Sequence, residues 1–229
     1  MPEPLEWLSR TRLVDEVADV LRDRIYSGRY PPGEALRQVQ ISQELKVSRT
    51  PLREALRMLE REGIVKAEVG GGVSVIQADY GRLIDAYALR EVIDGLAARL
   101  AAERSPDAVD RVLIPTIELQ KQAMEPWEPV VYTRANVDFH TAIIELSANE
   151  FLAGQLPIIR MTSQIFTPIS LIAKDRAELA IQEHLAIADA IRRGAGAEAE
   201  RLAHSHIRRT VSRLKSRAGP TASAPRNRK

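Results

Sequence analysis

The chain has 229 residues, of which 45% are hydrophobic and 28% charged, and it contains no cysteine. This length allows two modest domains, and the lack of cysteine excludes disulfide scaffolds and thiolate metal sites. No stretch approaches the roughly 18 apolar residues of a membrane span, and the first ten residues lack the apolar core of a secretory signal. We therefore expect a soluble protein of the cytoplasm that does not engage a membrane.

The formal net charge of +2 is small, so its distribution is more informative than its sum. Residues 1–76 carry 12 basic and 12 acidic side chains, whereas residues 201–229 carry 9 basic and none acidic. If the N-terminal part binds nucleic acid, it must use a local cluster of charge instead of a broad positive field.

The first third of the chain predicts three helices and a hairpin. Apolar residues repeat at helical spacing over 13–26, and the sequence SGRYPPGE at 27–34 ends that helix. A second helix is predicted at about 38–45, and a third begins after a three-residue break. Residues 63–77 then alternate in polarity around three central glycines, which predicts a β-hairpin.

The third predicted helix has two faces of different character. One face carries arginine at every fourth position, at Arg49, Arg53, Arg57 and Arg61. The other face is apolar, with Leu52, Ala55, Leu56 and Leu59. Because a helix turns about 100° per residue, one face can be buried while the other meets solvent or an anionic partner. Ser48 or Thr50 can cap the start of this helix, whose free N–H groups suit a phosphate.

A charged helix face is most often simply solvated, but the order of elements favours a second interpretation. A short helix, a tight turn, an arginine-faced helix and a glycine-tipped hairpin follow one another as in a winged helix-turn-helix. Arginine suits such a helix because its planar fork can grip a guanine edge or a phosphate with two hydrogen bonds.

The segment 12–76 resembles the GntR family of transcription regulators, most specifically in SRTPLREALRMLEREG. The resemblance implies that Arg49, Thr50 and Arg53 contact bases or phosphates, and that Gly71 lies in the wing tip that reaches the minor groove. Arg37, ahead of the second helix, is a further phosphate candidate.

One residue departs from this family pattern. Lys46 occupies the turn position that usually holds glycine. A residue with a side chain in a left-handed turn costs about 1 kcal/mol.

From residue 79 onward the pattern is helical. Helices are predicted near 79–104, 107–124, 130–148, 150–168, 174–193 and 197–217, with breaks at proline, asparagine or glycine. The short joints favour an all-α antiparallel bundle. The expected fold is thus mainly α: a winged helix-turn-helix domain at 1–78, a helical bundle at 79–217, and a basic disordered tail at 218–229.

All four histidines lie in the helical half. His140 shares a helix face with Asn136, four residues earlier, whereas His204 and His206 are about 200° apart around their helix. Imidazoles converging from three helices, with Asn136, would form a divalent metal site. The alternative is that each histidine, including His184, is an ordinary surface or core residue.

Three stretches, LREVIDGLAARLAAER at 89–104, NVDFHTAIIELSANEFL at 136–152 and EHLAIADAIRRG at 183–194, resemble the FCD ligand-binding domain of the FadR subfamily. The resemblance covers most of 79–217. It implies that the metal ligands are Asn136, His140, His184 and His206, with His204 left outside. Asparagine replaces the commoner aspartate, so the site carries one negative charge less. Zinc is the metal expected for so many imidazoles, while nickel or manganese would also fit.

The same resemblance implies a small carboxylate as effector, bound at or near the metal. Arg90 is the candidate clamp for that carboxylate, and the alternative interpretation of Arg90 is an ion pair with Asp94 one turn later.

The sequence predicts a homodimeric repressor that leaves an approximately palindromic operator in double-stranded DNA when the effector binds, with activation as the other possible sign. An alternative is a metal-dependent hydrolase with Glu183 as the base, but the histidines lack HExxH spacing and that function leaves the first domain unexplained. A purely structural DNA-bending protein leaves the histidines and the bundle unexplained.

Overall fold

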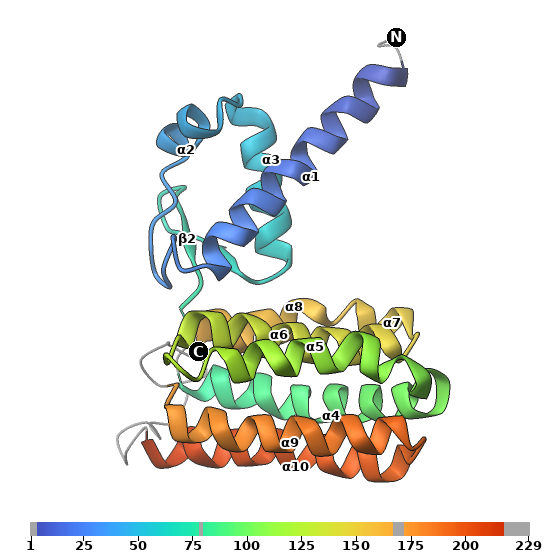
Figure 1. Ribbon diagram of the computed structural model, residues 1–229. Coiled ribbons are helices and arrows are strands. Elements are labelled where there is room, and N and C mark those ends of the chain that lie inside the picture. The colour runs from blue at the N-terminus through green and yellow to red at the C-terminus, as the bar shows by residue number, and fades with distance from the viewer. Residues whose placement is uncertain (1–3, 78–79, 167–171, 218–229) are drawn as a thin grey trace. The chain divides into compact units, whose positions relative to one another are not determined.

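The computed structural model describes residues 4–77, 80–166 and 172–217 (Figure 1). The chain divides into two compact units, residues 1–78 with 164–166, and residues 79–163 with 167–229. Among the described residues, no helix combines the length and apolarity that crossing a bilayer requires. The two units are described in turn.

The first unit is a winged helix-turn-helix, as predicted. It contains α1 (Pro4–Tyr26), α2 (Gln38–Leu45), α3 (Arg49–Arg61), β1 (Val65–Ala67) and β2 (Val73–Val75). The two strands pair antiparallel, with Val65 opposite Val75. Buried apolar side chains from α1, α3 and the hairpin, among them Leu21, Leu52 and Val75, form its core. The first helix begins earlier than the apolar repeat indicated, at Pro4 instead of residue 13.

The turn between α2 and α3 has the left-handed residue that the sequence led us to expect. Lys46 adopts φ 54° and ψ 38°. Its N–H donates to the carbonyl of Gln43, and the N–H of Val47 donates to that of Ser42, so the last carbonyls of α2 are satisfied. The turn therefore forms despite the cost of a side chain at this position.

The second unit is an all-α bundle, also as predicted. Its elements are α4 (Tyr80–Arg104), η1 (Pro106–Ala108), α5 (Val109–Gln122), α6 (Pro129–Leu146), α7 (Glu150–Ala153), α8 (Leu156–Arg160), the first half of η2 (Met161–Phe166), α9 (Lys174–Arg192) and α10 (Gly196–Arg217). The long helices run side by side in Figure 1, with α4 packed on α10, α5 on α6, and α9 on α10. A single apolar core, which includes Leu113, Ile144 and Ile187, holds them together.

The predicted single helix at 150–168 is wrong. The chain there forms α7, α8 and the π-helical segment η2 instead. The side chain of Asn149 caps α7, and Pro157 lies in the first turn of α8, where its missing N–H has no helical partner. A proline in the interior of one continuous helix would have removed a hydrogen bond. The end of that predicted helix, at 167–168, and the predicted tail at 218–229 lie outside the described residues.

Candidate DNA-binding surface and metal centre

The helix α3 has the two faces that its sequence predicts. The apolar face, Leu52, Ala55, Leu56 and Leu59, is at most 3% exposed. The four arginines Arg49, Arg53, Arg57 and Arg61 are all exposed. Burial of the leucines on α1, which packs against α3, leaves the arginine face on the surface of the unit.

Two arginines of α3 differ from Arg22 and Arg24 of the same unit, whose side chains pair with carboxylates of the chain. Arg22 pairs with Glu62 at 2.7 Å, and Arg24 pairs with Glu44 at 3.1 Å. Within the described part of the chain, the side chains of Arg49 and Arg53 form neither a hydrogen bond nor an ion pair. Their guanidinium groups are therefore available to an anionic partner outside the chain.

The start of α3 is open. Ser48 occupies the capping position, but it makes no side-chain hydrogen bond to the helix, so the expected cap by Ser48 or Thr50 is absent among the described residues. Thr50 is exposed. The free N–H groups of the first turn, together with the helix dipole, favour an anion such as a phosphate.

The two remaining DNA-binding candidates lie elsewhere on this unit. Arg37 is exposed and immediately precedes α2. Gly71 lies in the exposed turn between β1 and β2 with φ 89°, a conformation that a residue with a Cβ adopts only with strain.

Three histidines of the helical unit come together, which confirms their predicted convergence. His140 on α6, His184 on α9 and His206 on α10 are all buried, and one nitrogen from each lies within 4.8 Å of the others. The Nε2 atoms of His184 and His206 are 3.4 Å apart. His204 lies outside the cluster, as the spacing predicted, and its ring lies against Gly95 of α4.

Each of these imidazoles has a partner on its other nitrogen. The contacts join His140 Nδ1 to Asp94 Oδ1 at 2.6 Å, His184 Nδ1 to Gln120 Oε1 at 2.7 Å, and His206 Nδ1 to Glu183 Oε2 at 2.6 Å. All three acceptors are oxygens, so each Nδ1 carries the proton and donates it. Each Nε2 is then left with a free lone pair, which is the form that binds a metal.

The donor set fits a metal ion. Two nitrogens bound to one tetrahedral zinc at about 2.0–2.1 Å lie about 3.3–3.4 Å apart, close to the separation of His184 and His206. Burial lowers the pKa of all three imidazoles, that of His206 to about 4, and so keeps them neutral. Asn136 lies one turn before His140 on α6 and lines the same pocket.

The carboxylates behind the histidines remain charged. Burial opposes ionisation of Asp94, but the positive charge of Arg90 and the contact with His140 hold its pKa well below the usual range. Burial also opposes ionisation of Glu183, yet the hydrogen bond from His206 and the charge of Arg176 lower its pKa to about 2. Each charged carboxylate orients the ring that donates to it.

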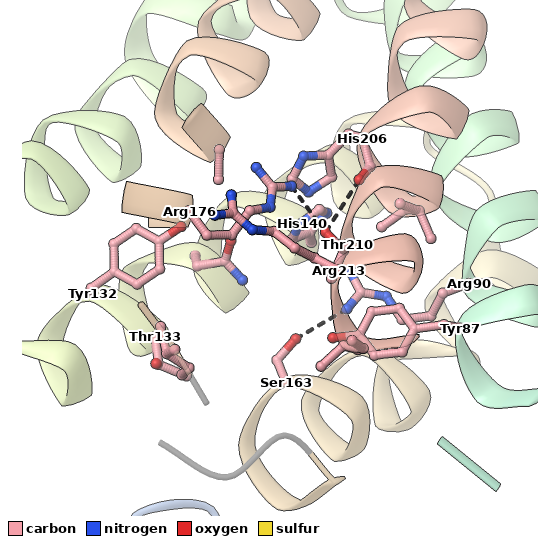
Figure 2. Close-up of a pocket in the computed structure, with 15 residues that line it drawn as sticks. Tyr87, Arg90, Tyr132, Thr133, His140, Ser163, Arg176, His206, Thr210 and Arg213 are labelled. Carbon is pink, nitrogen blue, oxygen red and sulfur yellow. Dashed lines mark hydrogen bonds between the residues drawn. The ribbon is translucent and has the colours of Figure 1, made fainter. Parts of the chain in front are cut away.

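A pocket of about 110 Å³ opens on the histidine cluster (Figure 2). Its walls include His140, His206 and Asn136, together with Arg90 and Arg176. A water molecule needs about 10–15 Å³ by this measure, so the pocket has room for several waters or for a small organic acid.

Arg90 forms an ion pair with Asp94, which was the alternative to its role as a carboxylate clamp. Its side chain is buried, and Nε lies 3.1 Å from Asp94 Oδ2. Its Nη1 donates to the hydroxyls of Thr162 and Ser163 at 3.1 and 3.0 Å. Arg90 nevertheless lines the pocket, so the ion pair and contact with a ligand are compatible.

Sequence reasoning missed two residues of this site. Gln120 ends the buried face of α5, after Val109, Leu113 and Ile117, and a glutamine in that apolar series was a signal of a buried polar contact. Arg176 lies seven residues before Glu183 on α9, and therefore on nearly the same helix face as that carboxylate.

Both units match families of known proteins. Residues 13–75 match the gntR family of bacterial regulatory proteins, and residues 85–209 match the FCD domain. The chain belongs to the GntR family. Its helical unit is the FCD domain that the sequence resembled.

Curated relatives of this GntR-family chain are transcription regulators. The Nta operon transcriptional regulator of Aminobacter aminovorans is 32% identical over 158 residues, which cover 69% of this chain and 73% of that protein. The probable D-xylose utilization operon transcriptional repressor of Paenarthrobacter nicotinovorans is 27% identical over 201 residues, 87% of this chain and 88% of that protein.

Solved structures share the fold. A GntR transcriptional regulator from Rhodococcus sp. RHA1 has a TM-score of 0.76 at 20% identity and covers 89% of this chain and 97% of its own. McbR/YncC of E. coli has a TM-score of 0.78 at 19% identity, with coverages of 90% and 99%.

This GntR-family chain is thus a DNA-binding transcription regulator, and its FCD domain fits regulation by a ligand. The family and the curated relatives are transcription regulators, not enzymes. The hydrolase alternative gains no support from the family or its relatives.

Proposed function

We propose that this regulator is a homodimeric repressor that binds a divalent metal and leaves its operator when a small carboxylate enters the FCD pocket. The observation that carries the proposal is the convergence of three buried, neutral Nε2 atoms beside a pocket that arginines line. The relative named as a D-xylose operon repressor supports repression as the sign of the response.

The proposed DNA contacts come from the open face of the first unit. Arg49, Thr50 and Arg53 contact bases or phosphates in the major groove, while Gly71 carries the wing tip into the minor groove. Arg37 contacts a phosphate. The exposure of all five residues supports these roles. A two-fold symmetric dimer would present two such surfaces to the half-sites of a palindromic operator.

The proposed metal ligands are Asn136, His140, His184 and His206. Zinc suits three imidazoles best, and nickel or manganese also fits. The bound metal would supply a Lewis acid that attracts a carboxylate oxygen. In this proposal Arg90, held by Asp94, adds positive charge to the carboxylate's surroundings.

The DNA-binding part of the proposal is tested with Arg53→Ala. We expect this variant to lose at least about tenfold in affinity for a duplex that the parent protein selects from a random-sequence pool, at matched salt, with unchanged metal content. Arg61→Ala, at the far end of the same helix face, is the matched control and should change the affinity much less. Equal affinities of Arg53→Ala and the parent would contradict the assignment.

The metal site is tested by elemental analysis. Protein purified without chelator should contain about one divalent metal per chain, and His184→Ala should lose it because one of three imidazole ligands is gone. His204→Ala is the control and should keep the metal, since His204 lies outside the cluster. A parent protein without metal would contradict the proposal.

A further inference from the structure

We infer that the effector carries two acidic groups, one directed to the metal and the second held by Arg176. The inference rests on the proposed function and narrows its ligand from a carboxylate to a short diacid. Three observations support it: the charge of the pocket wall, the unused donors of Arg176, and the neutrality of the proposed metal ligands.

The described pocket wall is cationic. Its charged lining residues are Arg90, Arg176 and Arg213, and the described lining contains no aspartate or glutamate. The carboxylates that pair with these arginines, Asp94, Glu183 and Asp175, do not line the pocket. A ligand in this pocket therefore meets positive charge and hydroxyl groups but no negative side chain, which favours an anion.

Arg176 has more unused donors than Arg90. Nε, Nη1 and Nη2 of Arg90 all donate to side chains of the protein. Arg176 uses only Nη2, which donates to Glu183 Oε2 at 2.8 Å and to Thr210 Oγ1 at 3.0 Å. Within the described residues, Nε of Arg176 is buried without an acceptor, and Nη1 has no hydrogen-bond partner.

Of these two donors, Nη1 is the one open to a ligand. A buried donor that lacks an acceptor is unfavourable, and a carboxylate is the acceptor that best matches a guanidinium. Figure 2 shows Arg176 with Tyr132 on one side of the pocket, and Arg90 with Tyr87 and Ser163 on the other. The second acidic group of the ligand would therefore lie on the Arg176 side.

The distance between the two acid-binding positions is short. Glu183 Oε2 accepts hydrogen bonds from both Arg176 and His206, at 2.8 and 2.6 Å. One carboxylate oxygen thus lies between the guanidinium and a proposed metal ligand. The pocket of about 110 Å³ limits such a diacid to a few carbons between its carboxylates.

The charge of the proposed metal site also calls for a second negative charge. Asn136, His140, His184 and His206 are all neutral as ligands, so the ligands themselves offset none of a divalent ion's charge. A monocarboxylate would offset half of that charge. A diacid brings two negative charges, one for the metal and one shared with Arg176.

The test compares diacids with monoacids of equal chain length. Calorimetric titration of zinc-loaded full-length protein would use malonate with propionate, succinate with butyrate, and glutarate with pentanoate, at constant ionic strength. Each acid is also titrated into zinc-containing buffer alone. We expect at least one diacid to bind about tenfold or more tightly than its matched monoacid, because a buried charged hydrogen bond is worth at least that factor.

Two variants assign the preference to Arg176. Arg176→Gln should reduce the diacid affinity to that of the monoacid and leave the monoacid affinity within about threefold. Arg209→Gln is the matched control: Arg209 also contacts Glu183, at 3.0 Å, but it does not line the pocket, so this variant should keep the preference. Unchanged monoacid binding and zinc content would show that Arg176→Gln is folded.

The contradicting outcomes are distinct. If diacids and monoacids bind equally, or if the diacid preference remains in Arg176→Gln, the inference of a diacid held by Arg176 is wrong. Either result leaves the proposed carboxylate effector uncontradicted. If no acid in the series binds the zinc-loaded protein, the proposed effector and this inference both fail.

Discussion

At the scale of single residues, the partner of each Nδ1 decides which nitrogen of each clustered histidine carries the proton and which is left for a metal. Asp94 and Glu183 are charged partners, whereas Gln120 is neutral and buried. Gln120 holds the ring of His184 and itself donates to the carbonyl of Ala135 at 3.3 Å. The tautomer of His184, and so its value as a metal ligand, depends on that one amide.

We therefore predict that Gln120→Leu weakens zinc binding about 10–100-fold, since the His184 ring loses the acceptor that fixes its orientation. The measurement is competition with a chromophoric chelator. Lys121→Leu changes the exposed neighbour of Gln120 and should leave the affinity unchanged. Zinc affinity that is equal in Gln120→Leu and the parent would contradict this role.

The buried imidazoles also predict how stability depends on pH once metal is removed. In the unfolded chain their pKa is about 6.5, whereas burial lowers it in the folded chain, to about 4 for His206. Below pH 6.5 the unfolded chain binds protons that the folded chain does not, so stability decreases as the pH falls toward 4. Urea unfolding of the metal-free protein at pH 7.5, 6.0 and 5.0 measures this decrease, and stability independent of pH in that range would contradict it.

The three histidines that converge could be predicted from the sequence, but the residues that hydrogen-bond to them only in part. The i,i+4 spacing of Asn136 and His140 and the resemblance to FCD domains were enough to select the histidines. The free donors of Arg176 could not be predicted, because they depend on how α9 and α10 pack around Glu183 and Thr210. The residue pattern of one helix does not show which side chains of another helix it will contact.

At the scale of elements, the close packing of α4 on α10 depends on Gly95. A Cβ at that position would lie 2.0 Å from ring atoms of His204. His204, which lies outside the histidine cluster, therefore has a packing role, and Gly95 leaves room for its ring. In the segment 150–166, the residue pattern predicts one helix, but the chain forms separate short helices. Asn149 caps the first of them, and Pro157 lies in the first turn of the second.

We predict that Gly95→Ala lowers the free energy of unfolding by about 1–3 kcal/mol, because the new methyl group overlaps the His204 ring. In the His204→Ala background the same change should be neutral or stabilising by up to about 1 kcal/mol, since alanine is the better helix former. Urea unfolding of the four proteins of this double-mutant cycle measures the coupling. A loss of stability that is equal in both backgrounds would contradict the contact.

At the scale of the whole molecule, the arginine face of α3 and the pocket of the FCD domain belong to separate compact units. A ligand in one unit can change DNA binding by the other only if it binds one conformation of the protein better than another. The same coupling must then act in reverse, so operator DNA should weaken the binding of the acid by the factor with which the acid weakens DNA binding.

The most direct test of the regulator is the affinity of the zinc-loaded protein for its selected duplex, measured by fluorescence anisotropy with and without a saturating acid. The acid used is the one that binds most tightly in the diacid and monoacid series. We predict that it weakens DNA binding at least about fivefold, the lower end of typical coupling between sites. An affinity for the duplex that stays the same at saturation would contradict control of DNA binding from the FCD pocket.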